Sequence, residues 1–226
     1  MDRIASALKP IKAIFWGEGA MARLGVPIVW EHYMFVIEDA DFATAVQQLQ
    51  AAGFQDCPWS YGSREPEFYK IRSIEHIYHE IVSNYSNLDR VSVRFRFPAA
   101  EPTATQTQKI VLLPSSYAHI RPSGPGLTSD GSMLYPDAPL LLLSFVKTAV
   151  REPCDDLWKW NLRMWAVSYV YGELMLSDDV LDSCNDEAAK TWFNEVIRRF
   201  SGGVDQVTRT KKLGRQGYNF VGEAPA

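Results

Sequence analysis

Residues 14–37 read IFWGEGAMARLGVPIVWEHYMFVI, and this stretch decides the fold that we expect. The apolar run 14–16 predicts a short strand that ends at Gly17, and residues 20–24 are compatible with a short helix. Gly25 and Pro27 end that helix, because glycine suits a C-terminal cap and proline suits the exit. The β-branched and aromatic run 28–37 predicts a longer strand. The stretch therefore indicates a strand–helix–strand unit of an α/β protein.

The pattern continues to alternate between helix and strand until about residue 137. A helix is expected over 42–52, after Asp39 and Asp41, and another over 71–82. Strands are expected over 90–97, where apolar residues alternate, and over 109–113. The segment 121–137, rich in Pro, Gly and Ser, is interpreted as a loop that forms a boundary or a lid. These elements predict an α/β core over residues 1–137.

The chain becomes helical after Pro139. We expect helices over 140–151, from Asp155 and Asp156 to about residue 174, and over 186–200. The middle helix is apolar around most of its circumference, which predicts that it is mostly buried. Residues 138–200 are therefore expected to form a helical part packed on the core. Residues 201–226 are expected to form a mobile basic tail.

Composition narrows the class of protein. Hydrophobic residues make up 46% of the 226 and charged residues 22%, as in globular proteins. The net charge of −4 removes the usual electrostatic reason to expect a nucleic-acid partner. The longest apolar run, 139–146, is far shorter than the ~20 residues of a membrane span. No signal peptide is evident, and three scattered cysteines fit reduced thiols. We therefore expect a cytoplasmic protein with no nucleic-acid partner and no membrane span.

The segment 16–27, WGEGAMARLGVP, followed by a strand, resembles the opening of the nucleotidyltransferase fold. It looks more closely like a group of fungal proteins of uncharacterised role that are built on that fold. In the family a strand ends in Gly-Ser or a variant, a short helix follows, and a Gly-Val-Pro-like turn leads into the next strand. The resemblance covers roughly residues 11–53. It implies a mixed sheet with flanking helices and a helical C-terminal part.

The same resemblance implies that the metal site of the family is missing. In the family the strand after the turn carries two aspartates one residue apart, and a later strand supplies a third acid to hold two metal ions. Counting from the turn, the pair falls at His32 and Met34. A slip of one residue gives Glu31 and Tyr33, which supply a single carboxylate, and positions 110 and 111 are apolar. We therefore expect a degenerate member of the fold that binds no metal or cofactor.

Two other sequence patterns are compatible with a metal site. Asp39 and Asp41 form a literal Asp-x-Asp pair, but they directly precede a helix, so capping by Asp41 is the favoured interpretation. His76, His79 and Glu80 share one helical face with a spacing that suits a transition metal. No fourth ligand or cysteine pair accompanies them, and a solvated polar face is favoured.

A hydrolase interpretation is available for Ser115 and Ser116, which follow a strand and lie near His119. The Gly-x-Ser-x-Gly turn of such enzymes is missing, and no acid partner is evident. Surface turn serines are the better interpretation. The glycine-containing segments 123–126 and 129–132 lack the lysine and the following helix of a phosphate-binding loop, and they are interpreted as ordinary or lid loops.

The favoured functional site is the cleft that, in the family, holds the metal-binding acids, which this chain lacks. Alternation along the strand places His32 and Met34 on one face, which is the floor of the cleft in the family. Aromatic residues from the strand edges and the apolar helix would border it, which favours an apolar small molecule. His32 is the candidate catalytic residue, as a hydrogen-bond donor that polarises a substrate carbonyl. The candidate substrate-binding residues are Trp16, Glu18, Trp30, Met34, Tyr117, His119, Trp160, Asn161, Trp165 and Tyr169.

Three functions follow as hypotheses. The first is a metal-independent cyclase or isomerase that acts on an apolar intermediate of fungal secondary metabolism, for example a terpenoid in a Diels–Alder cycloaddition, by holding the reacting ends together. Its partner would be that small molecule. The second is a residual nucleotidyltransferase that uses Asp39 and Asp41. The third is a non-catalytic binding module that uses its helical half.

Overall fold

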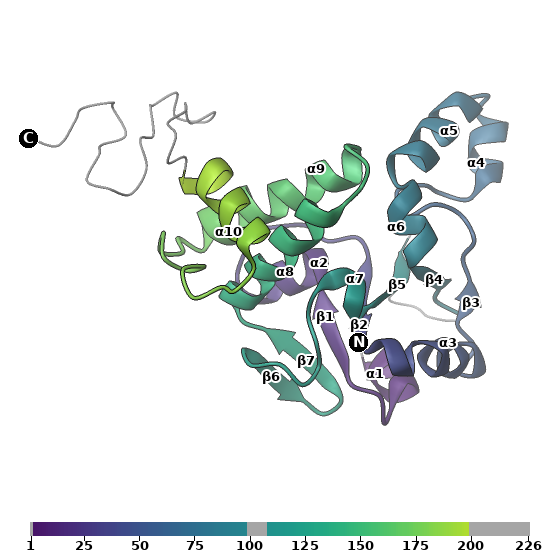
Figure 1. Ribbon diagram of the computed structural model, residues 1–226. Coiled ribbons are helices and arrows are strands. Elements are labelled where there is room, and N and C mark those ends of the chain that lie inside the picture. The colour runs from purple at the N-terminus through teal and green to yellow at the C-terminus, as the bar shows by residue number, and fades with distance from the viewer. Residues whose placement is uncertain (1, 99–107, 199–226) are drawn as a thin grey trace, which may run out of the picture.

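The structure is a computed structural model that describes residues 2–98 and 108–198. They form a mixed α/β fold in which helices flank one twisted sheet (Figure 1). No helix in these two ranges is both long enough and apolar enough to cross a membrane. The expected fold class, a mixed sheet with flanking helices, is confirmed. The expected basic tail, 201–226, lies outside the described residues.

The sheet is built around the strand–helix–strand unit that the sequence indicates. Its strand order is β3-β4-β5-β2-β1-β7-β6, with β1 and β2 antiparallel at the centre. Parallel pairs, β2 with β5 and β1 with β7, flank that centre, and the outer pairs are antiparallel. The strands are β1 Ala13–Trp16, β2 Tyr33–Ile37, β3 Gln55–Asp56, β4 Val93–Arg96, β5 Lys109–Pro114, β6 Leu127–Asp130 and β7 Met133–Pro136.

Helices cover both faces of the sheet. One face is covered by α1 Asp2–Leu8 and α3 Phe42–Ala51, the latter preceded by a 3₁₀ turn at Asp39–Asp41. The other face is covered by α2 Gly17–Arg23, α6 Ser86–Val91, α7 Ser115–Ala118, α8 Ala138–Arg151, α9 Leu157–Met164 with its π-helical continuation Trp165–Glu173, and α10 Glu187–Phe193 with its continuation Asn194–Arg198. Helices α4 Pro66–Ile71 and α5 Glu75–Asn84 project beyond α6 at one end (Figure 1).

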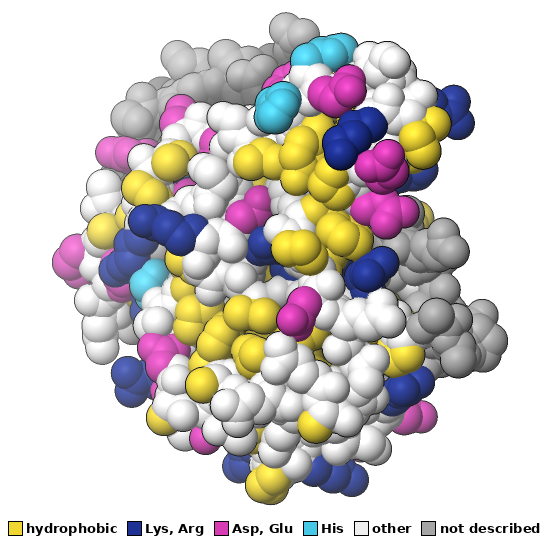
Figure 2. Space-filling model, turned by 90° about the vertical axis from the view of Figure 1, so that its right-hand side faces the viewer, with side chains coloured by type: hydrophobic (Ala, Val, Ile, Leu, Met, Phe, Trp, Pro, Cys, Tyr) yellow, Lys and Arg dark blue, Asp and Glu magenta, His cyan; other side chains and the backbone are white. Residues whose placement is uncertain are grey.

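Strand alternation divides the buried side chains into two cores. Met34 and Val36 of β2 lie in the larger core, beneath α8 and α9, whereas Phe35 and Ile37 lie in the smaller core beneath α1 and α3. Figure 2 views the end of the molecule formed by α3 to α6, where hydrophobic side chains run down the middle of the surface between charged ones.

The turn between β1 and α2 depends on glycine. Gly17 has φ +65°, and a Cβ atom built on it would lie 2.5 Å from the sulfur of Met34. A Cβ atom on Gly19 would lie 2.1 Å from the ring of Phe15. The Gly-Glu-Gly sequence therefore lets α2 start directly against the sheet, and it places Glu18 in the first turn of α2.

Several expected elements are confirmed, two expected strands are shorter than predicted, with β2 at Tyr33–Ile37 and β4 at Val93–Arg96, and one expected loop is wrong. The strands at 14–16 and 109–113 and the helices at 42–52 and 140–151 are present with small shifts of their ends. The expected strand 28–37 begins only at Tyr33, because residues 25–32 follow an irregular path after the Gly-Val-Pro turn. Segment 86–91, whose last residues were assigned to a strand, is helix α6.

The segment 121–137 is a hairpin and not the expected lid. Strands β6 and β7 pair antiparallel through the turn at Gly131, where φ is +63°. Strand β7 then extends the sheet by pairing with β1. The Asp-Gly sequence is a hairpin signal, but the many Pro, Gly and Ser residues around it suggested an open loop. The cap at Asp41 is also wrong, since its side chain makes no capping hydrogen bond.

Candidate functional site

A half-enclosed pocket of about 380 Å³ lies at the end of the central strands. It forms where the first turn of α2, the segment before β2 and the loop 60–64 meet, with α4, α9 and the α5–α6 junction completing its walls. The size is within the range of small-molecule sites. The lining residues are Glu18, Glu31, His32, Tyr61, Gly62, Ser63, Arg64, Tyr69, Tyr85 and Asn161.

Glu18 is the carboxylate in the wall of this pocket. Its Oε2 accepts a hydrogen bond from the backbone N–H of Glu31 at 3.1 Å, which ties α2 to the segment before β2. Burial raises the pKa of the Glu18 carboxyl, and the neighbouring charge of Glu31 raises it further. The raised pKa makes this carboxylate a stronger base toward a substrate proton than a free carboxylate, which favours proton transfer.

His32 is buried, with 7% of its surface exposed, but it lines the pocket. Its Nδ1 accepts the backbone N–H of Lys109 at 3.4 Å, and its ring stands edge-on to the ring of Tyr61, with the centroids 4.8 Å apart. Burial and the charge of Lys109 lower its pKa to about 3. The imidazole is therefore neutral at physiological pH, and with Nδ1 as an acceptor its proton is on Nε2.

Lys109 is the cation behind the pocket wall. Its side chain is 2% exposed, and its Nζ donates to the carbonyl oxygens of Ser60, Tyr61 and Ser63 at 2.6, 2.7 and 2.5 Å. Burial lowers the pKa of its ammonium to about 8. Lys109 thus fixes the turn at 60–63 that forms one wall of the pocket.

Hydroxyl and amide groups supply the remaining polar surface. Asn161 of α9 donates from Nδ2 to the hydroxyl of Tyr85 at 3.2 Å. The hydroxyl of Tyr61 contacts the sulfur of Met34 at 3.9 Å, which is a weak hydrogen bond. Burial raises the pKa of both tyrosines, and the charge of Glu18 adds to it. Both phenols are therefore protonated at neutral pH and are available as donors.

The structure brings three of the expected site residues together: Glu18, His32 and Asn161 all line this pocket. His32 also lies on the same side of the sheet as Met34, since Tyr61 contacts both side chains. The lining is mostly polar, which differs from the apolar surface that we expected.

The other expected residues lie elsewhere. Trp16, Met34 and Trp165 are at most 5% exposed and are part of the larger core, so they form its packing and not the pocket lining. Trp30 packs on the opposite face of the sheet, against Phe15 and Tyr33. Trp16 and Trp165 are core because the apolar helices α8 and α9 cover the space where we expected a cleft.

The remaining expected residues belong to helical packing. Tyr117 donates to Glu152 at 2.7 Å and accepts from Trp158 Nε1 at 2.6 Å, in a cluster beneath α8. His119 ends α7 in a left-handed conformation with φ +53°. Trp160 is 54% exposed on α9, and Tyr169 packs at the edge of the larger core. None of these four is among the residues that line the Glu18 pocket.

The metal-site alternatives find no support in the described residues. Within residues 2–98 and 108–198, no group of three or more His, Cys, Asp or Glu side chains is placed to hold a metal ion. Asp39 instead accepts from the Ser115 hydroxyl and the Ser116 backbone N–H, each at 3.0 Å, at the start of α7. His76 and His79 lie exposed on α5, as the solvated-face interpretation predicts.

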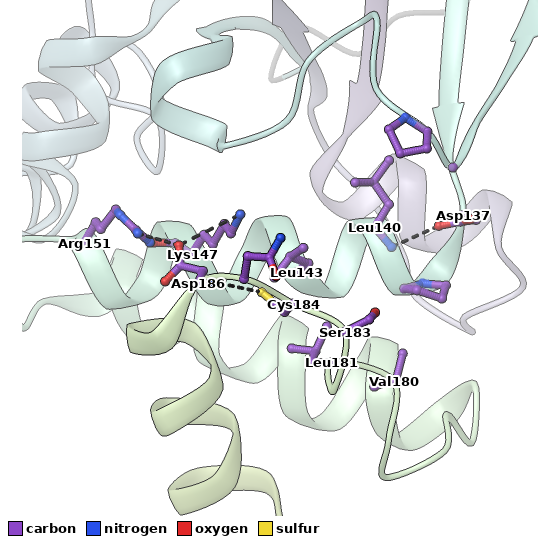
Figure 3. A pocket seen from close by; sticks show the side chains of 14 residues that line it. Asp137, Leu140, Leu143, Lys147, Arg151, Val180, Leu181, Ser183, Cys184 and Asp186 are labelled. Atoms are coloured by element: carbon purple, nitrogen blue, oxygen red, sulfur yellow. Dashed lines mark hydrogen bonds and ion pairs between the residues drawn. The ribbon is translucent and has the colours of Figure 1, made fainter.

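A second hollow of about 790 Å³ lies between α8 and the segment before α10 (Figure 3). Its floor is apolar, and Lys147 and Arg151 lie at one end. Both cations are paired with Asp186, at 3.9 and 2.5 Å, so their charge is largely satisfied. The Glu18 pocket is the better candidate site, because its carboxylates have no such partners.

Sequence reasoning missed Lys109, Tyr61 and Tyr85. Lys109 stands at the first position of a strand that is otherwise apolar, which was available as a signal of a buried charge. The tyrosines lie in the turn-rich region 55–85, which gives no periodic pattern from which their direction could be derived.

Comparison with protein-family models, with curated proteins and with solved structures finds no match to this chain. The fold and the pocket therefore define it only as a mixed α/β protein with a polar pocket at the end of its central strands.

Proposed function

We propose that this chain is a metal-independent enzyme of the isomerase or cyclase type, which transforms a small molecule in the Glu18 pocket. The observation that carries the proposal is the meeting, in one half-enclosed pocket, of a half-buried carboxyl group with a raised pKa, two protonated phenols and a neutral imidazole. This combination suits proton transfer and the stabilisation of developing charge.

Each group has a role in such a reaction. Ionised Glu18 takes a proton from one atom of the substrate and returns it at another, so the composition of the substrate is unchanged. The Tyr85 hydroxyl, oriented by Asn161, donates to the substrate oxygen on which negative charge develops. His32 remains neutral throughout, because its pKa is about 3. It serves as a hydrogen-bond donor and forms part of the pocket wall, but it does not act as an acid.

The degenerate nucleotidyltransferase origin is part of this proposal. The glycine turn into α2 and the position of His32 at the start of β2 support it, since both lie at the pocket. The mostly polar lining favours a substrate with at least one polar end over a purely hydrocarbon skeleton. The substrate is otherwise a small molecule that fits a volume of about 380 Å³.

The test uses purified protein and a panel of isoprenoid and polyketide precursors that carry polar groups. Products of unchanged mass are detected by chromatography and mass spectrometry, and the same reactions in D₂O report proton exchange. Glu18→Gln should lower turnover by about 10²–10⁴-fold. Glu67→Gln, at an exposed carboxylate of α4 that pairs with Lys70, should leave it unchanged. Ligand binding without conversion by the wild-type protein would favour the binding-module alternative.

A further inference from the structure

We infer that the ligand of the Glu18 pocket carries a protonated nitrogen, as in a small organic amine, which is held between the carboxylates of Glu18 and Glu31. The inference rests on the proposed function for the location of the site, and it adds the chemical class of the ligand. It follows from how the charges around the pocket are distributed.

The two carboxylates of the pocket have no cationic partner. Among the described residues, neither Glu18 nor Glu31 forms an ion pair within 4.0 Å. Glu18 is instead hydrogen-bonded to a backbone N–H, and its charge raises the pKa of the nearby tyrosines. Two carboxylates in one small cavity repel each other, and a cation between them removes that repulsion.

Lys109 lies beside the pocket and Arg64 lines it, but neither forms an ion pair with Glu18 or Glu31. The ammonium of Lys109 is directed at three carbonyl oxygens behind the wall. The guanidinium of Arg64 lies over the ring of Phe68, 4.7 Å from its centroid. His32 is neutral. The negative charge at the opening is therefore available to a ligand.

The rest of the lining suits an organic cation and not a metal ion. The described residues hold no cluster of three potential metal ligands, so a divalent ion would lack most of its coordination. Tyr61, Tyr69 and Tyr85 instead supply aromatic surface and hydroxyl oxygens. Aromatic walls together with carboxylates are the surroundings that recognise ammonium groups through cation–π and ionic contacts.

The groups that face Glu18 from the neighbouring elements set the electrostatics of binding. A bound cation should lower the pKa of Glu18, which burial and the charge of Glu31 raise, so that amine binding releases protons wherever Glu18 is partly protonated in the free protein. The facing groups are Glu31 and His32 before β2, Tyr61 and Arg64 of the 60–64 loop, Tyr85 before α6 and Asn161 of α9.

The experiment compares three probes of similar size that differ in charge: 2-phenylethylamine, 2-phenylethanol and 3-phenylpropionate. Isothermal calorimetry should show that the amine binds at least about tenfold more tightly than the alcohol, because each tenfold in affinity requires only ~1.4 kcal/mol. The propionate should bind most weakly. Titrations in two buffers with different ionisation enthalpies, repeated at several pH values below neutral, should show proton release by the wild-type protein where Glu18 is partly protonated.

Two glutamine variants test whether Glu18 and Glu31 are the groups that bind the amine. Glu18→Gln keeps an oxygen that can accept the Glu31 N–H, so the fold is preserved, and it should abolish proton release and weaken the amine by at least about fivefold. Glu31→Gln should also weaken the amine, whereas neither variant should change binding of the alcohol. Glu67→Gln on α4 is the matched control, and it should change neither proton release nor the affinity for the amine.

Other outcomes overturn the inference. Equal affinity for the amine and the alcohol, no binding of the amine, or unchanged amine binding in both glutamine variants would each do so. Failure of the proposed function is distinguishable from this. If the amine binds as expected but Glu18→Gln changes no turnover, the ligand class stands and the assignment of Glu18 to proton transfer does not.

Discussion

Replacing His32 with glutamine should remove a pH dependence of stability that the wild-type protein shows between pH 7 and pH 5. His32 is 7% exposed, and burial lowers its pKa from 6.5 to about 3. In the unfolded chain the imidazole takes up a proton near pH 6.5, whereas in the folded protein it stays neutral. The unfolded state therefore binds more protons in this window. The contribution of His32 is complete above pH 6.5 and is lost as the pH falls toward 3.

The size of the effect follows from the two pKa values. Between pH 7 and pH 5 the protonation of the unfolded chain at this one residue lowers the free energy of unfolding by about 2 kcal/mol. Raising the folded pKa by one unit changes this value by less than about 0.1 kcal/mol, because the folded imidazole is still neutral at pH 5. The expected loss of about 2 kcal/mol is a substantial fraction of a total stability of about 5–15 kcal/mol.

The assay is urea unfolding followed by tryptophan fluorescence at pH 7, 6 and 5. Wild-type protein and His76→Gln, a control at an exposed histidine of α5, should show the same loss on acidification. His32→Gln should lose about 2 kcal/mol less than either. The wild-type protein and His32→Gln differ only at residue 32, so the difference between their losses isolates His32. Equal losses in wild type and His32→Gln would refute the buried neutral imidazole.

Three structural predictions concern the walls of the pocket and the packing behind it. Lys109→Met should lower the free energy of unfolding by about 1–3 kcal/mol, because three buried carbonyls lose their donor, and an unchanged urea midpoint would contradict this. Gly62→Ala should cost about 1–3 kcal/mol, since a Cβ atom would lie 2.4 Å from the Tyr85 ring, and calorimetric melting would measure it. Tyr117→Phe should cost about 2–4 kcal/mol by leaving Glu152 and the Trp158 N–H short of a partner. It should leave amine binding unchanged, and weakened binding would show that Tyr117 acts on the pocket.

The sequence predicts the fold well wherever one local rule decides the structure. The apolar runs at β1 and β5 and the Asp-capped helix α9 follow from periodicity and capping alone, and Asp156 accepts the Lys159 N–H at 3.0 Å as such a cap should. The hairpin β6–β7 is harder, because the pairing of β7 with β1 brings together segments more than a hundred residues apart. Only that pairing distinguishes a strand from a loop in a segment so rich in Pro, Gly and Ser.

The sequence predicts the position of a site residue only where that residue lies next to a central strand, because the strand fixes the course of the chain there. Glu18 and His32 flank β1 and β2, so their place at one end of the sheet follows from the glycine turn and from strand alternation. The aromatic residues were assigned to the pocket because their type suits a ligand. Trp16 and Trp165 instead pack against each other, with ring centroids 6.1 Å apart, in the core. Residue type alone does not distinguish a binding wall from a core.

The position of Lys109 explains why the pocket is negative although a buried cation lies beside it. A lysine at the first position of β5 stands next to His32, close to the place where the resemblance expects a third acid. Its side chain does not line the pocket, and its ammonium is satisfied by the carbonyls of the 60–63 turn, so its charge stabilises the wall. The carboxylates of Glu18 and Glu31 remain on the ligand side. Because opposite charges are separated by the wall, a cationic ligand gains attraction from the carboxylates without displacing an existing ion pair, which would otherwise offset its affinity.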